Sequence, residues 1–353
     1  VFMSKKVTIS DVAKLANVAP ATVSRVLNNT SYVSAETRRH VEAAIKQLQF
    51  IPDASAQSLK TNSTHTIGFL VPDISNAFHS TMARAIEDIV SKKNYMLLLC
   101  STNEDRKREL TYLKSFLSKN VDALILNSTG YNERLVYEIS QKIPTILVNR
   151  RVFYPNLTYD FFDIDGYQGS YLLTKQLLKL GHRKIFVIHG PRNLSNSQSR
   201  LNGFRTAMKD EGIVIDESYP FMFDGRFTCQ GGIDAVEYLC SLSDTPTAIL
   251  SQNNFSTEGV LKAFREKNIV VPDDISLVSH NELSNWDSLI VRPTYADFDT
   301  ANIAATIGHR ILARLENPSL PTQEFLFPPK IIPGNSVTIP TSNLTNKLHH
   351  INR

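Results

Sequence analysis

Residues 8–28 decide the fold of the N-terminal part of the chain; they read TISDVAKLANVAPATVSRVLN. Thr8 and Asp11 have the spacing of a helix capping box, with aspartate in the place of the usual glutamate. Apolar residues follow at helical intervals, beginning with Val12 and Leu15. The stretch therefore predicts a short helix that buries one apolar side.

A second short helix is predicted after a break at Asn17. Pro20 suits the first turn of a helix, where its missing backbone N–H is no loss. The apolar side chains of this helix recur at helical spacing and would face inward: Val23, Val26 and Leu27.

A third helix is predicted to begin after Ser34, because serine is a favoured residue at a helix N-cap. Its inward stripe consists of Val41, Ala44, Ile45 and Leu48. Two short helices separated by a tight turn, with a third behind them, form a helix-turn-helix unit. A compact three-helix unit without a ligand would show the same periodicity, so the pattern alone does not decide the function.

Charge is concentrated in the same part of the chain. The whole sequence has 38 Lys/Arg and 34 Asp/Glu, a formal net charge of +4, and residues 1–60 hold eight of the basic and four of the acidic side chains. A small basic unit on a neutral body predicts a polyanion-binding head, with a solvated basic surface as the alternative. Nucleic acid is favoured by a set of polar side chains sized for phosphates and base edges: Thr22, Ser24, Arg25 and Asn28.

These segments resemble the DNA-binding head of LacI/GalR-type repressors. The similarity runs through residues 7–61 and continues over nearly the whole chain. It implies four parts: a helix-turn-helix domain at 5–51, a hinge helix or linker at 52–64, an effector-binding and dimerisation core at 65–340, and a polar tail at 341–353.

The resemblance also implies how the head binds DNA. The helix at 20–28 would enter the major groove, where Arg25 contacts a base with its two-pronged donors, guanine being the natural partner. Pro20 and Ala21 would make apolar base contacts. The residues implied to lie along the DNA backbone are Ile9, Ser10, Thr22, Ser24, Asn28, Ser34 and Thr37, with Tyr32 reaching the backbone or a base.

The hinge is implied to pair with its copy from a second subunit, so that Leu59, one turn after Ala56, wedges into the minor groove. Ala19 stands where the family usually has serine, and the lost helix cap should cost about 1 kcal/mol of binding free energy. The implied partners are therefore a palindromic double-stranded DNA site and a second copy of the chain.

From about Thr66 the chain alternates short apolar runs with helical patterns. The runs are 67–71, 95–99, 123–126, 145–148, 185–188, 248–250 and 276–278. Strands that alternate with helices predict an α/β core of doubly wound parallel sheets. The resemblance makes this core two lobes of the periplasmic-binding-protein-like fold, crossed by three connections, with a ligand cleft at the carboxyl ends of the strands.

The resemblance assigns nine residues to the effector cleft: Phe78, His79, Asn127, Asn149, Arg150, Arg200, Asn253, Asn254 and Asn281. Arg200 lies in the motif RLNGF, which is typical of the arginine that binds an effector in the family. The segment DGYQG at 165–169 resembles a turn of the family.

Three of the cleft positions usually carry aspartate in the family but carry amides here: Asn149, Asn254 and Asn281. Each change removes a negative charge, so Arg150 and Arg200 would lose acidic partners. We therefore expect a cleft that is more positive than usual and suited to an anionic effector such as a sugar phosphate, rather than to a neutral sugar. The alternative is a cleft that has lost small-molecule binding.

Other classes of protein are disfavoured by what the sequence lacks. It carries no dinucleotide fingerprint, phosphate-binding loop, zinc-protease motif or nucleophile elbow, so we expect no enzyme activity, cofactor or metal. The longest apolar run, Tyr95–Cys100, is far shorter than the ~20 residues of a membrane span.

Residues 1–6 resemble no secretory signal, and three cysteines without metal-ligand spacing fit a reducing cytoplasm. The leading interpretation is a homodimeric, sequence-specific transcriptional repressor that responds to a sugar or sugar phosphate. The alternative is a solute-binding or sugar-sensing module without a role on DNA.

Overall fold

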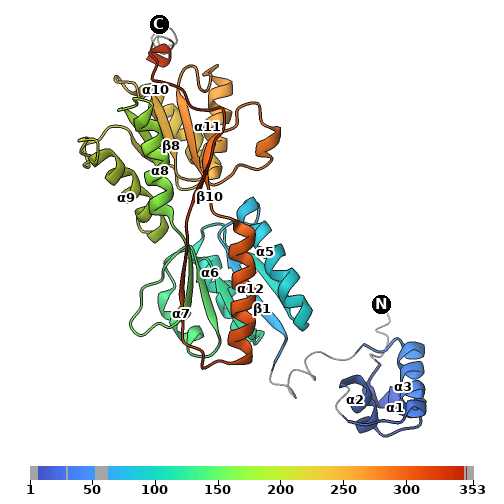
Figure 1. The fold of residues 1–353 in the computed structure, drawn as a ribbon. Helices are drawn as coiled ribbons and strands as arrows, with labels where there is room; N and C mark the ends of the chain where they lie inside the picture. The colour runs from blue at the N-terminus through green and yellow to red at the C-terminus, as the bar shows by residue number, and fades with distance from the viewer. Residues whose placement is uncertain (1–6, 29–30, 52–62, 346, 348–353) are drawn as a thin grey trace. The chain divides into compact units, whose positions relative to one another are not determined.

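The structure, a computed structural model, describes residues 7–28, 31–51, 63–345 and 347 of the chain. The chain separates into two compact units, Val1–Thr64 and His65–Arg353 (Figure 1). The predicted hinge, with Ala56 and Leu59, falls on residues that lie outside the described part. Within that part, no helix combines the length and the apolar character needed to span a bilayer.

The first unit contains three helices: α1 (Ile9–Leu15), α2 (Pro20–Asn28) and α3 (Ala35–Leu48). The predicted capping box begins α1, because the Thr8 hydroxyl accepts from Asp11 N and the Asp11 carboxylate accepts from Thr8 N at 2.9 Å. Ser34 caps α3 by accepting a hydrogen bond from Thr37 N at 3.2 Å. The chain turns between α1 and α2 at Asn17, whose φ is 52°.

The core of the first unit follows the predicted periodicity with one correction. Val12, Val23 and Val41 are fully buried and pack together. Leu15, which was predicted to face inward, is 45% exposed, and Ala13 is buried in its place. Val12, Ala13 and Ala16 form the packed side of α1, and Leu15 lies outside it.

The second unit contains two six-stranded sheets, one in each lobe. The sheet of the first lobe has the strand order β11 (Glu324–Phe327), β5 (Asp160–Ile164), β4 (Thr145–Val148), β3 (Ala123–Leu126), β1 (Thr66–Val71) and β2 (Met96–Ser101), and all neighbours are parallel. The sheet of the second lobe has the order β12 (Lys330–Ile332), β10 (Thr294–Asp297), β9 (Ser276–His280), β8 (Ala248–Ser251), β6 (Ile185–His189) and β7 (Met222–Asp224), and only the β10–β12 pair is antiparallel.

Helices cover both sheets, as doubly wound folds require. Those of the first lobe are α5 (Ala77–Val90), α6 (Arg106–Ser118), α7 (Glu133–Ser140) and α12 (Thr300–Glu316). Those of the second lobe are α8 (Gly166–Lys179), α9 (Ser195–Lys209), α10 (Cys229–Ser241) and α11 (Asn254–Glu266). Two single turns of 3₁₀ helix complete the set, η1 (Ser91–Lys93) and η2 (Trp286–Ser288).

The chain passes between the lobes three times: after β5, after β10 and after β11 (Figure 1). The α12 helix therefore returns to the first lobe, where it packs along α5. The predicted fold class, with two doubly wound lobes and three connections, is confirmed. The crossings place the carboxyl ends of both sets of parallel strands on either side of one cleft.

The C-terminal segment differs from the expected polar tail. Leu344 is 1% exposed and belongs to the core of the second lobe. Asn343 Nδ2 donates to the carbonyl oxygen of Asp273 at 2.9 Å, and Lys347 pairs with Asp274. A single apolar side chain has no periodicity, which is why the sequence pattern did not reveal this packing.

Candidate functional site

The exposed side of α2 carries the residues assigned to base contacts. Pro20, Ala21 and Arg25 are exposed, and within the described part of the chain no side chain pairs with the Arg25 guanidinium. Asn28 Nδ2 donates to the carbonyl oxygen of Ser24 at 2.9 Å and to its hydroxyl at 3.3 Å. The helix therefore presents one unpaired arginine at the surface, beside the hydrogen-bonded residues Ser24 and Asn28.

The residues assigned to the DNA backbone lie at helix ends, within α2 and in the segment before α3. Ser10, Tyr32 and Ser34 are exposed, Tyr32 to 94%. Ile9, Thr22, Ser24 and Thr37 are half-buried. Ser34 and Thr37 share a hydrogen bond of 2.8 Å at the N-terminus of α3, where free backbone N–H groups favour an anion.

The second unit holds a cavity of about 750 Å³ between its lobes, and all nine predicted effector residues line it. Phe78, His79, Asn127, Asn149 and Arg150 come from the first lobe. Arg200, Asn253, Asn254 and Asn281 come from the second lobe. The carboxyl ends of the parallel strands thus bring together residues that are more than 200 positions apart in the sequence.

His79 and Asn127 form a polar pair on the first-lobe side of the cavity. His79 Nδ1 lies 2.9 Å from the carbonyl oxygen of Asp73, so Nδ1 carries the proton; Nε2 then accepts from Asn127 Nδ2 at 3.3 Å. Burial, opposed by the hydrogen bond to Asp73 and assisted by the charge of Arg150, lowers the pKa of His79 to about 4. The histidine is therefore neutral, and Asn127 Oδ1 remains as an unsatisfied buried acceptor.

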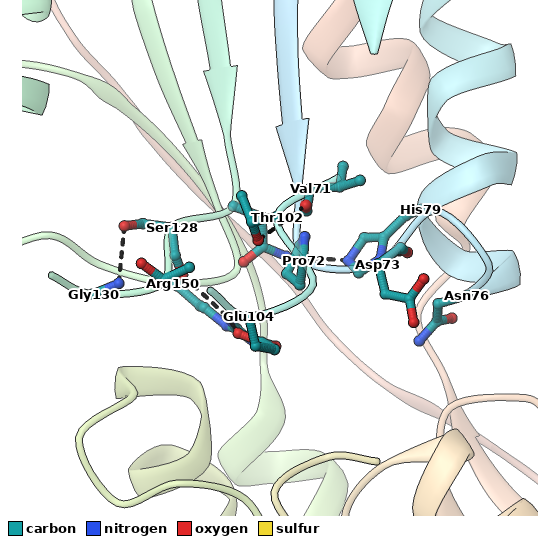
Figure 2. Close-up of polar contacts among 12 residues, drawn as sticks. Val71, Pro72, Asp73, Asn76, His79, Thr102, Glu104, Ser128, Gly130 and Arg150 are labelled. Carbon is teal, nitrogen blue, oxygen red and sulfur yellow. Dashed lines mark hydrogen bonds and ion pairs between the residues drawn. The ribbon is translucent and has the colours of Figure 1, made fainter. Parts of the chain in front are cut away.

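Arg150 has an acidic partner, contrary to expectation. Its guanidinium donates to both carboxylate oxygens of Glu104, at 2.8 and 2.7 Å, and its side chain is 5% exposed (Figure 2). Arg150 also lowers the pKa of Glu104 against the effect of burial, so the carboxylate is ionised. Glu104 follows β2 rather than one of the strands that end in asparagine, so the sequence pattern did not connect the two.

Arg200 reaches the cavity from α9. Its Nη1 donates to the carbonyl oxygen of Gln252 at 2.6 Å, and its guanidinium lies 5.4 Å from the centre of the Phe227 ring. Burial lowers the pKa of Arg200 to about 9, helped by repulsion from Arg150, and the group is still charged at neutral pH.

The motif RLNGF keeps this helix close to α8. A Cβ at Gly203 would lie 2.1 Å from the carbonyl oxygen of Tyr167, so only glycine allows the two helices to approach this closely. A Cβ at Gly166 would lie 3.0 Å from the Arg200 side chain. The two motifs that the sequence analysis singled out therefore pack together and direct Arg200 into the cleft.

The asparagines of the cleft have different roles. Asn149 and Asn281 follow their strands with φ of 61° and 74°, a left-handed conformation that asparagine tolerates. Asn253 caps α11 by accepting from Ser256 N at 3.2 Å. Asn254 forms hydrogen bonds across the cleft with Asn76, a residue that the sequence analysis did not assign to the site.

Six buried polar atoms of the cavity lining have no partner among the described residues. They are Asn127 Oδ1, Asn149 Oδ1, Asn196 Oδ1, Thr129 Oγ1, Arg150 Nε and Arg200 Nε. Buried polar groups are normally hydrogen-bonded, so this concentration indicates a ligand that both donates and accepts hydrogen bonds.

The charge of the lining is balanced. The ionisable acidic residues are Asp73, Glu104 and Glu258, and the basic ones are Arg150, Arg200 and Arg226. The lining therefore carries no formal net charge, and the expectation of a cleft more positive than is usual in the family stays a prediction. The amide substitutions do remove three carboxylates, but Glu104 and Glu258 supply negative charge from loops and helices that the family motifs do not cover.

Taken together, the exposed helix α2 in a three-helix unit and a polar cleft between two α/β lobes define a ligand-responsive DNA-binding regulator. Comparison with known families agrees: residues 8–53 match "Bacterial regulatory proteins, lacI family", and residues 64–314 match "Periplasmic binding proteins and sugar binding domain of LacI family". The chain belongs to the LacI family of bacterial regulatory proteins, and it is not an enzyme.

Individual relatives fit this assignment. The ribose operon repressor of Escherichia coli K12 is 35% identical over 285 residues, which cover 78% of this chain and 83% of the relative. The transcriptional repressor PurR of Haemophilus influenzae PittEE is 32% identical over 278 residues, which cover 78% and 81%. In fold, the chain is similar to the lac repressor dimer bound to operator and the anti-inducer ONPF, with a TM-score of 0.80, 24% identity, and coverage of 95% of this chain and 100% of that one.

Proposed function

We propose that this protein is a homodimeric repressor that binds a palindromic operator and changes its DNA affinity when a small molecule occupies the cleft between the lobes. Two observations of the first unit support DNA binding: the unpaired Arg25 on the exposed side of α2, and the concentration of the net positive charge in residues 1–60. The dimer named in the lac repressor structure supports the oligomeric state. Such a protein acts in the cytoplasm, where the chromosome lies.

We infer that the effector is an uncharged, hydroxyl-rich molecule of monosaccharide size. The observation that carries this proposal is the set of unsatisfied amide oxygens and guanidinium N–H groups around a charge-balanced cavity. A hydroxyl group can donate to an amide oxygen and accept from a guanidinium, whereas a phosphate only accepts. A phosphate would also meet Glu104, whose partner Arg150 is already engaged.

The DNA-binding part is tested by selection of bound fragments from a random duplex pool, with and without a panel of metabolites. We expect an enriched site with two-fold symmetry, because a dimer with two copies of α2 binds two half-sites. Enrichment of no sequence under any condition would reject the proposal. A symmetric site would also exclude the alternative of a sugar-sensing module without a role on DNA.

The effector part is tested by calorimetry with ribose, other neutral monosaccharides and their phosphates. We expect binding of at least one neutral sugar and weaker binding of its phosphate. A clear preference for the phosphate would support the original expectation of a positive cleft and reject the neutral effector. Absence of binding by all neutral compounds would favour a cleft that has lost ligand binding.

A further inference from the structure

Two buried asparagines join the lobes across the effector cleft. Asn76 Nδ2 donates to Asn254 Oδ1 at 3.2 Å, and Asn254 Nδ2 donates to Asn76 Oδ1 at 3.1 Å. The two side chains come from residues 178 positions apart, and they are 7% and 3% exposed. Asn76 lies at the start of α5 in the first lobe, and Asn254 is the first residue of α11 in the second lobe.

The orientation of both amides is fixed by the backbone. Asn76 is the N-cap of α5, and its Oδ1 accepts a hydrogen bond from Phe78 N at 3.0 Å. The oxygen must therefore face the helix, which leaves Nδ2 as the donor toward Asn254. Asn254 then has only one orientation in which it both accepts from Nδ2 and donates to Oδ1.

We propose that Asn254 is a positioning residue rather than an effector ligand: its amide, paired with that of Asn76, holds the two halves of the effector site in the arrangement that the structure shows. Both residues line the cavity, so a ligand that contacts either amide must compete with this pair. The competition between a ligand and this pair rests on the proposed function, whereas the two hydrogen bonds between the asparagines do not. A second bond of this kind, from Arg151 N to Ser195 Oγ at 2.9 Å, also joins the lobes.

The pairing explains why an amide is needed at position 254. A carboxylate there could accept from Asn76 Nδ2 but could not donate to Asn76 Oδ1, so two acceptor oxygens would face each other. The carboxylate would also be a buried charge without a cation among its hydrogen-bond partners. The amide at this position therefore serves the contact between lobes and does not adjust the charge of the cleft for a ligand.

Hydrogen–deuterium exchange of the ligand-free, full-length protein tests the proposal. Asn254→Ala removes the second-lobe amide from a helix position that alanine favours, and Asn254→Asp removes the donor at nearly constant volume. Asn76→Ser keeps a good helix cap but is too short to reach across. We expect Asn254→Ala and Asn254→Asp to speed exchange at residues 72–80 of the first lobe, and Asn76→Ser to speed it at residues 252–258 of the second. Each effect should be on the order of tenfold, the usual consequence of losing one net hydrogen bond.

The controls separate a contact between lobes from local damage. Asn302→Ala changes an exposed asparagine on α12 and should alter neither segment. The double variant Asn76→Ser/Asn254→Ala should exchange no faster than the faster single variant, because both changes remove the same contact. Faster exchange confined to the lobe that carries the substitution, or effects that multiply in the double variant, would overturn the proposal. Neither ligand nor DNA is used, so this result is independent of the proposed effector and operator.

Discussion

At the scale of single residues, Asp163 is an unusual carboxyl beside the cleft. Burial raises its pKa to about 7, and the charges of Arg151 and Arg200 oppose that rise only in part. An aspartate in the unfolded chain has a pKa of about 3.9. The folded state therefore holds the proton more tightly, so this group favours folding below pH ~4 and loses that contribution as the pH rises through 7.

We predict that Asp163→Asn stabilises the protein, and that the gain is larger at pH 8 than at pH 5 by about 1–3 kcal/mol. The amide keeps the shape of the protonated acid and cannot ionise. Urea unfolding at the two pH values measures the difference. Asp88→Asn, on the exposed side of α5, is the matched control and should change stability by similar amounts at both. Equal gains at both pH values for Asp163→Asn would contradict the argument.

Arg25 offers a prediction about sequence recognition. Because its guanidinium is exposed and unpaired, Arg25→Ala should relax the base preference at one position of each half-site, with a loss of about 1–3 kcal/mol for the preferred base. Arg25→Lys should restore little, because lysine lacks the planar pair of donors. Competition binding with single-base variants of the selected site measures this preference.

Lys5, which lies outside the described residues, gives the contrasting prediction. Lys5→Ala should weaken binding to all duplexes alike and leave the base preference unchanged, as the loss of a phosphate contact does. If both substitutions changed specificity equally, the assignment of Arg25 to a base would be rejected.

The residues of the cleft could be predicted as far as strand ends and family motifs reach. All nine assigned residues line the cavity, because each follows a buried strand, begins the next helix or belongs to a motif. Glu104 could not be paired with Arg150 from the sequence, since an ion pair between two loops leaves no periodic signal. The loss of three carboxylates was visible, but the carboxylates that replace their charge were not.

At the scale of elements, the sequence predicted the strands that are continuous apolar runs, including β2 at a sheet edge, and missed five strands of mixed polarity. Two of the missed strands, β5 and β10, lie inside their sheets. β7, β11 and β12 are edge strands of three or four residues with mixed polarity. The start of α11 at Asn254 is set by a polar residue, because Asn253 caps the helix ahead of its apolar stripe.

The contact of α12 with β5 shows how an element returning from the second lobe is fixed to the first. Asp160 of β5 is 1% exposed, and its carboxylate accepts from Arg310 Nε at 2.9 Å, Arg314 Nη1 at 3.4 Å and Gln323 N at 2.8 Å. Two arginines of α12 and the backbone before β11 thus share one buried acid.

We predict that Asp160→Ala lowers the free energy of unfolding by about 3–5 kcal/mol, because two largely buried arginines lose their partner. Asp160→Asn should cost less, since its carbonyl oxygen can still accept from Gln323 N. Urea unfolding of both variants measures the order. An alanine variant as stable as the asparagine variant would show that the acceptor oxygen kept by asparagine contributes nothing.

At the scale of the whole molecule, the net positive charge is concentrated in the DNA-binding part of the chain. Residues 1–60 carry a net charge of +4, equal to that of the complete chain, so the remaining residues are balanced overall. The effector cavity is balanced as well, with three acidic and three basic side chains in its lining. Binding to a polyanion releases condensed counterions and so depends on salt, whereas binding of a neutral molecule does not.

The two binding events should therefore respond differently to ionic strength. Between 50 and 200 mM salt we predict that operator affinity falls on the order of a thousandfold, because a dimer with two basic heads contacts several phosphates. Over the same range the affinity for a neutral effector should change less than about twofold, since Arg150 is already neutralised by Glu104 and no net charge enters the cleft. Fluorescence anisotropy with the selected operator and calorimetry with the effector measure the two slopes. A comparable loss of effector affinity with salt would mean that the ligand is anionic, and the charge-balanced cleft would then have to be reorganised when it binds.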